Sequence, residues 1–292
     1  EPKKLRIVFQ MANTCIYWVV ALRSEAEPII QRFKMKLFAN HHGKSGFPIW
    51  ESQNASESDV THRLVLCGIG KINAAAAVSW LQAVTNAMDC GAVAWINFGI
   101  AGHRQRTIGE VVRANKVTDV ATGKSWYPPA AWKRKVDLKA APLQTVDAPT
   151  SNYSDEDYLI DMESSGVFAV ASRFSSLELI QSIKVISDNA EHAIEGITKE
   201  SVREACNAAL IEIAPWLEAY IEIAREESSR IEAPPLYETL IGCISFSETQ
   251  KHQLRRILIR HHAVGTDLQC GSLTALKSGR EVIAALSAIV DE

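Results

Sequence analysis

The sequence predicts an α/β fold in which helices flank a central β-sheet, followed by a small helical appendage at the C-terminus. Three observations lead to this prediction. Strand-like apolar runs alternate with helix-like segments along most of the chain. Residues 92–98 are almost continuously apolar, as in a strand covered on both faces. Residues 232–235 contain two adjacent prolines, which are typical of a boundary. We therefore expect an α/β domain over residues 1–231 and a helical extension over residues 232–292.

The strands are predicted where short apolar runs end at glycine or polar residues. They are expected at residues 15–22, 63–67, 92–98, 111–120 and 183–187. Gly99 and Gly102 are predicted to end the third of them. Residues 126–157 contain several prolines and are predicted to be loop-rich.

The helices are predicted from their composition and from capping signals. They are expected at residues 24–33, 73–88, 164–174, 199–227, 247–262 and 279–289. Ser24 is a candidate N-cap, and Pro215 is expected to bend or interrupt the fourth helix. Residues 247–250 form a Ser-Glu-Thr-Gln capping box at the start of the fifth.

Composition favours a globular protein with a small ligand. The chain has 292 residues, 47% of them hydrophobic and 22% charged, which is enough to bury a sizeable core. The formal net charge of −3 gives no general attraction to nucleic acid or to anionic lipid. A small-molecule partner is therefore expected, with no nucleic acid and no membrane.

Cysteine and histidine positions argue against a metal site. The six cysteines are widely spread without a C-x-x-C pair, and most are expected to be buried thiols in a reducing compartment.

The apolar run 15–22 is shorter than the roughly 20 residues of a membrane span. We therefore expect a cytoplasmic protein.

His261 and His262 lie near three arginines, but a solvated helix face explains them better than a metal or nucleic-acid contact.

Carboxylates follow two strand-like runs, at positions where α/β proteins build their sites. Asp161-Met162-Glu163 ends the run that begins at Leu159, and Ser187-Asp188 ends the run that begins at Ile183. Two glycine-containing turns accompany them, Gly68-Ile-Gly-Lys-Ile-Asn73 and Asn97-Phe-Gly-Ile-Ala-Gly102. Over roughly residues 15–224 this set resembles the nucleoside phosphorylase and nucleosidase superfamily, and most closely 5′-methylthioadenosine/S-adenosylhomocysteine nucleosidase.

The resemblance implies a mixed sheet, a homodimer, no cofactor and no metal, and it assigns roles to individual residues. Cleavage of an N-ribosyl bond needs an acid for the leaving purine and an anchored ribose. By resemblance, Asp188 is the catalytic acid, next to Ser187. Glu163 binds the ribose hydroxyls through charge-assisted hydrogen bonds, and Met162 packs against the sugar.

The attacking group separates the two branches of the superfamily. Ala21-Leu-Arg-Ser-Glu25 matches the A-x-x-x-E pattern in which the nucleosidase branch supplies a glutamate that activates water. Glu25 is therefore the implied base. Many phosphorylases carry an arginine where this chain has Asn97. The turn from Gly68 to Asn73 also resembles the nucleosidase version, so the resemblance implies hydrolysis. Ile100, Ala101 and Gly102 form the strand-end turn that the resemblance places at the ligand.

Two departures concern the substrate. Ile100 stands where a small hydroxyl residue is usual, and Pro149 occupies the position of the aromatic residue that stacks on adenine. Tyr153, Tyr158 and Trp126 are candidates to replace that stacking contact.

Other functions remain open at this point. One is a phosphorylase in which Arg23, Arg104 or Arg106 binds phosphate. Another is a nucleoside-binding module without turnover. Read without the resemblance, Asp188 is a helix cap, Glu25 is a first-turn residue favoured by the helix dipole, and the glycines serve tight turns.

Overall fold

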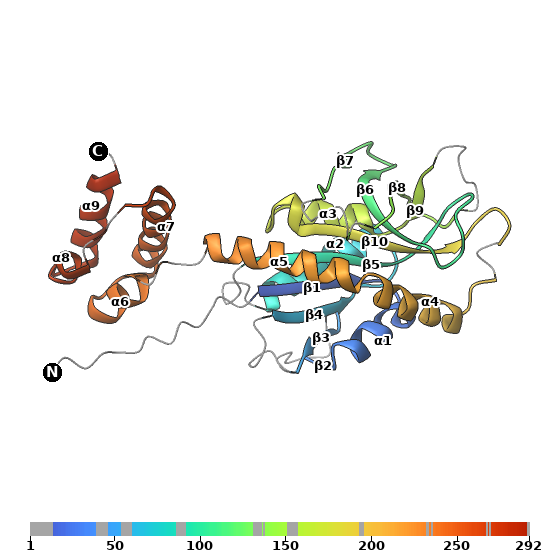
Figure 1. Cartoon of the computed structure of the whole chain (residues 1–292), viewed down its shortest axis with the longest axis horizontal. Coiled ribbons are helices and arrows are strands. Elements are labelled where there is room, and N and C mark those ends of the chain that lie inside the picture. Colours follow the sequence, from blue (N-terminus) through green and yellow to red (C-terminus); the bar gives the residue numbers. More distant parts are fainter. Residues whose placement is uncertain are drawn as a thin grey trace. The chain divides into compact units, whose positions relative to one another are not determined.

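The computed structural model describes most of the chain in two compact units, Glu1–Ser228 and Ser229–Glu292 (Figure 1). The described residues are 14–38, 46–53, 60–85, 92–130, 136, 138–150, 157–192, 196–231, 234, 236–266, 268 and 270–290.

Within the described residues of the first unit, the strands join in one mixed sheet. They are β1 (Thr14–Val20), β2 (Met35–Leu37), β3 (Ile49–Ser52), β4 (Val60–Leu66), β5 (Val93–Gly102), β6 (Val111–Asp119), β7 (Ser125–Trp126), β8 (Ala140–Thr145), β9 (Leu159–Asp161) and β10 (Ile180–Asp188). The strand order is β10-β6-β8-β9-β5-β1-β4-β3-β2, with β7 beside β6. This sheet with its flanking helices confirms the predicted fold class.

Strand β5 organises the sheet because it pairs with three others. It runs parallel to β1 and β10 and antiparallel to β9. Since β10 also pairs with β6, strands β5, β10, β6, β8 and β9 close on themselves. The end of β5 is shared: Gly102 lies opposite both Asp188 of β10 and Ile160 of β9. Segments far apart in the sequence therefore meet at this point.

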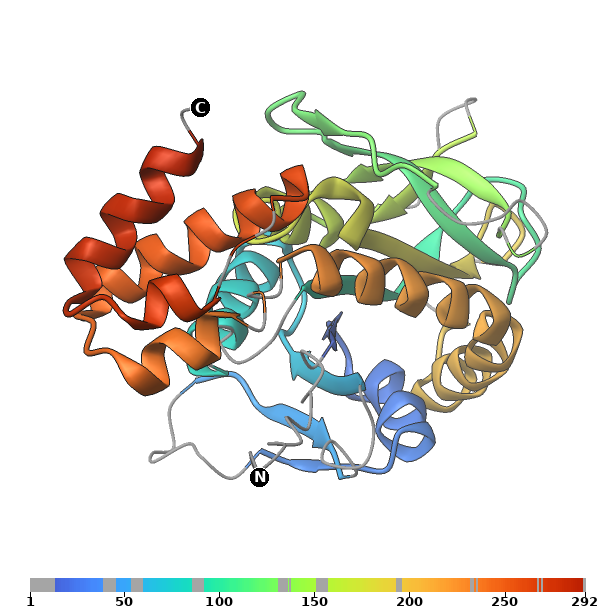
Figure 2. The same cartoon turned by 60° about the vertical axis from the view of Figure 1, so that its left-hand side comes forward.

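The helices cover both faces of the sheet. They are α1 (Arg23–Arg32), α2 (Lys71–Val84), α3 (Ser164–Ala171), the short 3₁₀ helix η3 (Leu177–Leu179), α4 (Lys199–Glu212) and α5 (Ala214–Ile231). Figure 2 shows α1 and α4 side by side, in agreement with their contacts. Cys15, Tyr17 and Val19 of β1 belong to a buried cluster with apolar residues of α2 and α3. The alternate residue Trp18 packs instead against Phe33 and Phe98, as expected when successive side chains point to opposite faces.

One predicted strand end is wrong, and one segment predicted to be loop-rich contains a strand. Strand β5 continues through Gly99 to Gly102, because both neighbouring strands pair with its end. Residues 126–157 are not all loop: they contain β8, in which Pro142 lies at a register shift, where the missing proline N–H is tolerated. The interruption predicted at Pro215 is confirmed: the segment 199–227 forms two helices that meet at Ile213, because Pro215 has no N–H to continue the first.

The second unit is a helical bundle. It contains α6 (Leu236–Cys243), α7 (Glu248–Val264), α8 (Cys270–Thr274) and α9 (Gly279–Val290), packed around a core that includes Leu254, Leu258 and Leu286. The predicted capping box is present, since Ser247 and Gln250 exchange hydrogen bonds at the start of α7. His261 is not on a solvated face: it is 1% exposed, and its Nε2 lies 2.8 Å from the carbonyl oxygen of Leu286.

The cysteines are less uniform than predicted. Cys67 and Cys206 are buried thiols, Cys243 and Cys270 are exposed thiols, and Cys15 is disulfide-bonded. In the part of the chain that the structure describes, no helix is both long and apolar enough to cross a membrane.

Candidate active site

A cavity of about 240 Å³ opens where β1, β5, β9 and β10 end. Its lining comes from segments that the shared end of β5 brings together. The lining residues are Ala21, Leu22, Glu25, Ile69, Ile100, Ala101, Gly102, Val146, Pro149, Thr150, Ile160, Asp161, Met162, Glu163, Ser187, Asp188 and Ile197. All eight residues proposed from the sequence to form the site are among them.

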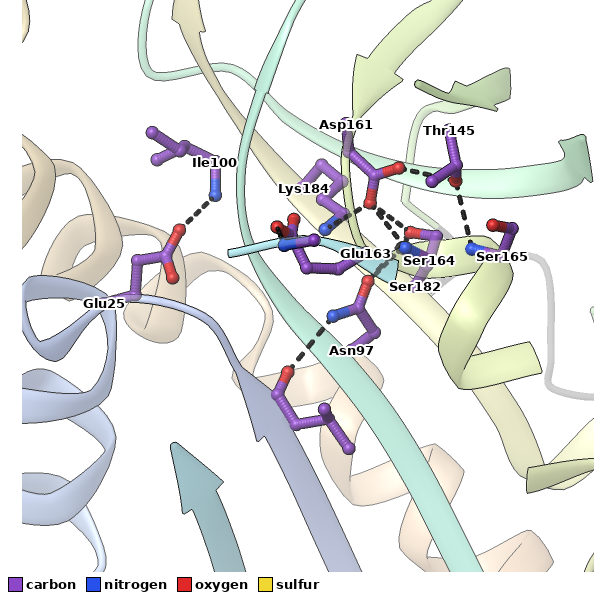
Figure 3. Close-up of polar contacts among 12 residues, drawn as sticks. Glu25, Asn97, Ile100, Thr145, Asp161, Glu163, Ser164, Ser165, Ser182 and Lys184 are labelled. Carbon is purple, nitrogen blue, oxygen red and sulfur yellow. Dashed lines mark hydrogen bonds and ion pairs between the residues drawn. The ribbon is translucent and has the colours of Figure 1, made fainter. Parts of the chain in front are cut away.

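Glu25 is a buried carboxylate held by two backbone amides. Helix α1 begins directly after the turn that follows β1, and this places Glu25 in its first turn. Oε2 accepts a 2.8 Å hydrogen bond from the N–H of Leu22. Oε1 accepts a 2.9 Å hydrogen bond from the N–H of Ile100, which Figure 3 shows. A Cβ atom on Gly99 would lie 2.7 Å from Oε1, so any larger residue there would displace the carboxylate of Glu25.

Burial raises the pKa of Glu25 from 4.5 to about 7. The two backbone hydrogen bonds and the nearby Lys184 lower this pKa in part, and the charge of Glu163 raises it further. A carboxyl group with a pKa near 7 is suited to accept a proton at neutral pH.

Glu163 and Met162 lie in the turn between β9 and α3. Oε1 of Glu163 accepts a 2.8 Å hydrogen bond from the N–H of Gly70, whose φ of +104° favours glycine. Burial raises the pKa of Glu163, the charge of Asp161 raises it further, and Lys184 lowers it. Because α3 packs tightly against the start of α2, a Cβ atom on Gly166 would lie 2.0 Å from the carbonyl oxygen of Lys71.

Asp188 lies at the end of β10, where the register against β5 shifts. Its side chain is buried, and its Oδ1 accepts a 2.5 Å hydrogen bond from the hydroxyl of Ser187. That hydroxyl also lies 3.4 Å from the carbonyl oxygen of Ala101. Asp188 and Ser187 thus face the cavity from one strand, while Glu163 reaches it from the turn after another.

The two base-stacking candidates among the described residues, Trp126 and Tyr158, do not line the cavity. Trp126 is buried against Phe168. Tyr153 lies outside the described residues. Pro149 does line the cavity, so in the described part of the lining the apolar contacts come from aliphatic side chains, Met162 and Pro149.

The arginines considered as phosphate ligands also lie elsewhere. Arg23 pairs with Glu27 and stacks on Trp50. Arg104 and Arg106 line a separate pocket of about 600 Å³, where Arg106 pairs with Asp157. None of the three lines the cavity of Glu25.

Asp161 and Lys184 were not assigned a role from the sequence, although both belong to the site region. Nζ of Lys184 lies 2.9 Å from Oδ2 of Asp161, and both side chains are almost fully buried (Figure 3). The signal was Lys184 itself, since a lysine in the middle of an apolar strand needs a buried carboxylate partner. In the described residues there is no cluster of three or more His, Cys, Asp or Glu side chains that could hold a metal ion.

Solved structures, rather than sequence relatives, resemble this chain. No protein-family model and no curated protein matches it. An MTA/SAH nucleosidase aligns with a TM-score of 0.55 at 18% identity, and the 5′-methylthioadenosine nucleosidase of Arabidopsis thaliana with 0.55 at 16%; each alignment covers 73% of this chain and 96% of the other. Futalosine hydrolase of Helicobacter pylori aligns with 0.51 at 16%, covering 72% and 98%. This chain therefore has the fold of these nucleosidases and of futalosine hydrolase.

Proposed function

We propose that this protein hydrolyses the N-glycosidic bond of a purine nucleoside or of a 5′-modified adenosine derivative and releases the free base and the free sugar. The cavity supports this proposal because it brings together Glu25, Glu163 and Asp188, the three carboxyl groups that the reaction needs. The structural neighbours that share the fold are described as nucleosidases and a futalosine hydrolase.

Each carboxyl group has a separate task in this proposal. Asp188 protonates the purine as the C–N bond breaks and its electron pair moves to the base. Glu163 accepts hydrogen bonds from the two vicinal ribose hydroxyls, and these strengthen as positive charge develops on the sugar. Glu25 takes a proton from the water whose oxygen bonds to the anomeric carbon. Its backbone hydrogen bonds hold it in place for that step.

One observation favours water over phosphate as the attacking group. In the described lining of the cavity there is no lysine, arginine or histidine. Phosphate recognition relies on cationic donors, which the cavity's carboxylates would oppose. We therefore favour hydrolysis over phosphorolysis.

We also propose a homodimer. Ile69 lines the cavity and is 54% exposed, and Ile72 beside it is 80% exposed. A second copy would cover this apolar rim. Light scattering on the purified protein tests the proposal, since Ile72→Asp should increase the monomer fraction.

The activity is tested with a panel of purine nucleosides that differ in base and in 5′ substituent. Base release is followed by chromatography, and binding by calorimetry. Release from at least one nucleoside supports an enzyme. Binding without release identifies a nucleoside-binding module. If the protein neither binds nor cleaves any of these nucleosides, the proposal is refuted.

A further inference from the structure

Lys184 and Asp161 form a buried ion pair beside the cavity. They come from β10 and β9, which are not neighbours in the described sheet, and their side chains are 1% and 0% exposed. Asp161 lines the cavity, whereas Lys184 does not. An isolated charge at such depth is strongly unfavourable, so each partner depends on the other.

Asp161 is fixed by more than its cation. Its Oδ1 accepts a 2.7 Å hydrogen bond from the hydroxyl of Thr145, and its Oδ2 accepts a 2.9 Å bond from the N–H of Ser164. The hydroxyl oxygen of Ser164 lies 2.5 Å from Oδ2 of Asp161 and 2.8 Å from Oδ1 of Asn97. The backbone turn from residue 161 to 164 is therefore tied at both ends.

Met162 and Glu163 are the two residues inside this turn. The carboxylate of Glu163 is also anchored from outside this turn, by the N–H of Gly70 on a different loop. The position of the Glu163 carboxylate thus depends on Asp161, which is two residues away along the backbone, and on Gly70, which donates a hydrogen bond to it. Lys184 also acts on Glu163 directly, because its charge opposes the rise in the pKa of Glu163.

We propose that the Lys184–Asp161 ion pair positions Glu163 for recognition of the substrate's ribose hydroxyls. Lys184 holds Asp161 in its place, and Asp161 holds the turn that presents Glu163. Lys184 and Asp161 are positioning residues in this account, and neither touches a reacting atom. The inference rests on the proposed ribose-binding role of Glu163.

The test compares kcat/KM for a purine riboside and for its 2′-deoxyriboside in the wild type, Lys184→Met and Asp161→Asn. In metal sites, loss of a residue that holds a ligand in place costs about 10- to 100-fold in affinity or activity, and we take that range as the guide here. We expect a loss of that size on the riboside and a much smaller loss on the 2′-deoxyriboside, so that the preference for ribose falls about tenfold or more.

Arg63→Met is the matched control. Arg63 pairs with Glu51 between β4 and β3, with Nε 2.6 Å from Oε2, and neither residue lines the cavity. This change also removes a partly buried cation, but it should leave the ribose preference unchanged. A preference that falls equally in this variant would show a general effect of stability and overturn the inference.

Two further variants keep the test decisive. Lys184→Arg retains the charge and should recover most of the preference, which also covers the case in which Lys184→Met fails to fold. In a Glu163→Gln background, Lys184→Met should lower the ribose preference no further. The ion-pair inference is refuted if Glu163→Gln lowers the ribose preference but folded Lys184→Met or Asp161→Asn leaves it unchanged. The proposed role of Glu163 would then still stand. If Glu163→Gln itself has no effect on the preference, the proposed role of Glu163 is wrong.

Discussion

Glu25 links the stability of this protein to pH, and Glu25→Gln measures that link. The pKa of its carboxyl group is raised from 4.5 to about 7, mainly by burial. A raised pKa means that the folded protein favours the protonated form. The resulting stabilisation is complete below about pH 4.5 and is lost as the pH rises through about 7.

The size follows from the two pKa values. A pKa that differs by one between the folded and unfolded states corresponds to about 1.4 kcal/mol, and most of the change from 4.5 to about 7 is expressed between about pH 5 and pH 8. Ionisation of Glu25 therefore lowers the free energy of unfolding by about 2 to 3 kcal/mol over that interval. The glutamine side chain of the variant cannot ionise, and titrations shared by both proteins largely cancel in the comparison. The amide of the glutamine also replaces a carboxylate at the N–H of Leu22. This replacement changes the unfolding free energy of the variant by an amount that does not vary with pH.

The assay is urea unfolding of the wild type and Glu25→Gln at several pH values from about 5 to 8. The difference between the two unfolding free energies should change by about 2 to 3 kcal/mol in favour of the variant as the pH rises. The wild-type kcat/KM should rise through about pH 7, because only the ionised carboxylate accepts a proton. Parallel stability curves would refute the assignment of a buried, titrating Glu25. Glu27→Gln, on the same helix but outside the cavity, should keep wild-type activity.

Three further predictions concern single residues. Asp188→Asn should fold normally, as checked by thermal melting, and should lose about 10²- to 10⁴-fold in kcat, the usual contribution of a general acid; near-normal turnover would remove Asp188 from the mechanism. Glu163→Gln should reduce activity on ribosides far more than on 2′-deoxyribosides, and equal losses would argue against hydroxyl recognition. Gly166→Ala should destabilise the protein by about 1 to 3 kcal/mol or more in urea unfolding, because its Cβ would lie 2.0 Å from the backbone oxygen of Lys71; unchanged stability would mean that α2 and α3 can separate without loss.

Local patterns predicted the parts of the fold that local chemistry determines. The apolar runs located β1, β4, β5, β6 and β10, and the Ser247–Gln250 pattern located the start of α7. Strand β8 was missed because its ability to pair depends on β6 and β9, which are separate segments of the chain. The end of β5 was misplaced for the same reason, since glycine was taken as a breaker where two partners hold the strand.

The site shows the same division. The strand-end motifs led to Glu25, Glu163 and Asp188, and the structure places all three at one cavity. The Lys184–Asp161 pair was not predicted, because the two residues belong to different strands, and their contact arises only when the strands close around β5. The stacking role considered for Trp126 failed because an aromatic side chain packs just as well into the core, where Trp126 lies against Phe168.

The most direct test of the central claim is to run the reaction in phosphate-free buffer made with oxygen-18 water and to analyse the sugar product by mass spectrometry. The cavity holds carboxylates and, in its described lining, no cation, so water is expected to be the attacking group. We predict free sugar that carries one labelled oxygen before exchange at the anomeric carbon, formed at a rate that added phosphate does not change. Glu25→Ala should bind the nucleoside and form no labelled sugar. Product that appears only with phosphate, as a sugar 1-phosphate without label from water, would contradict the account.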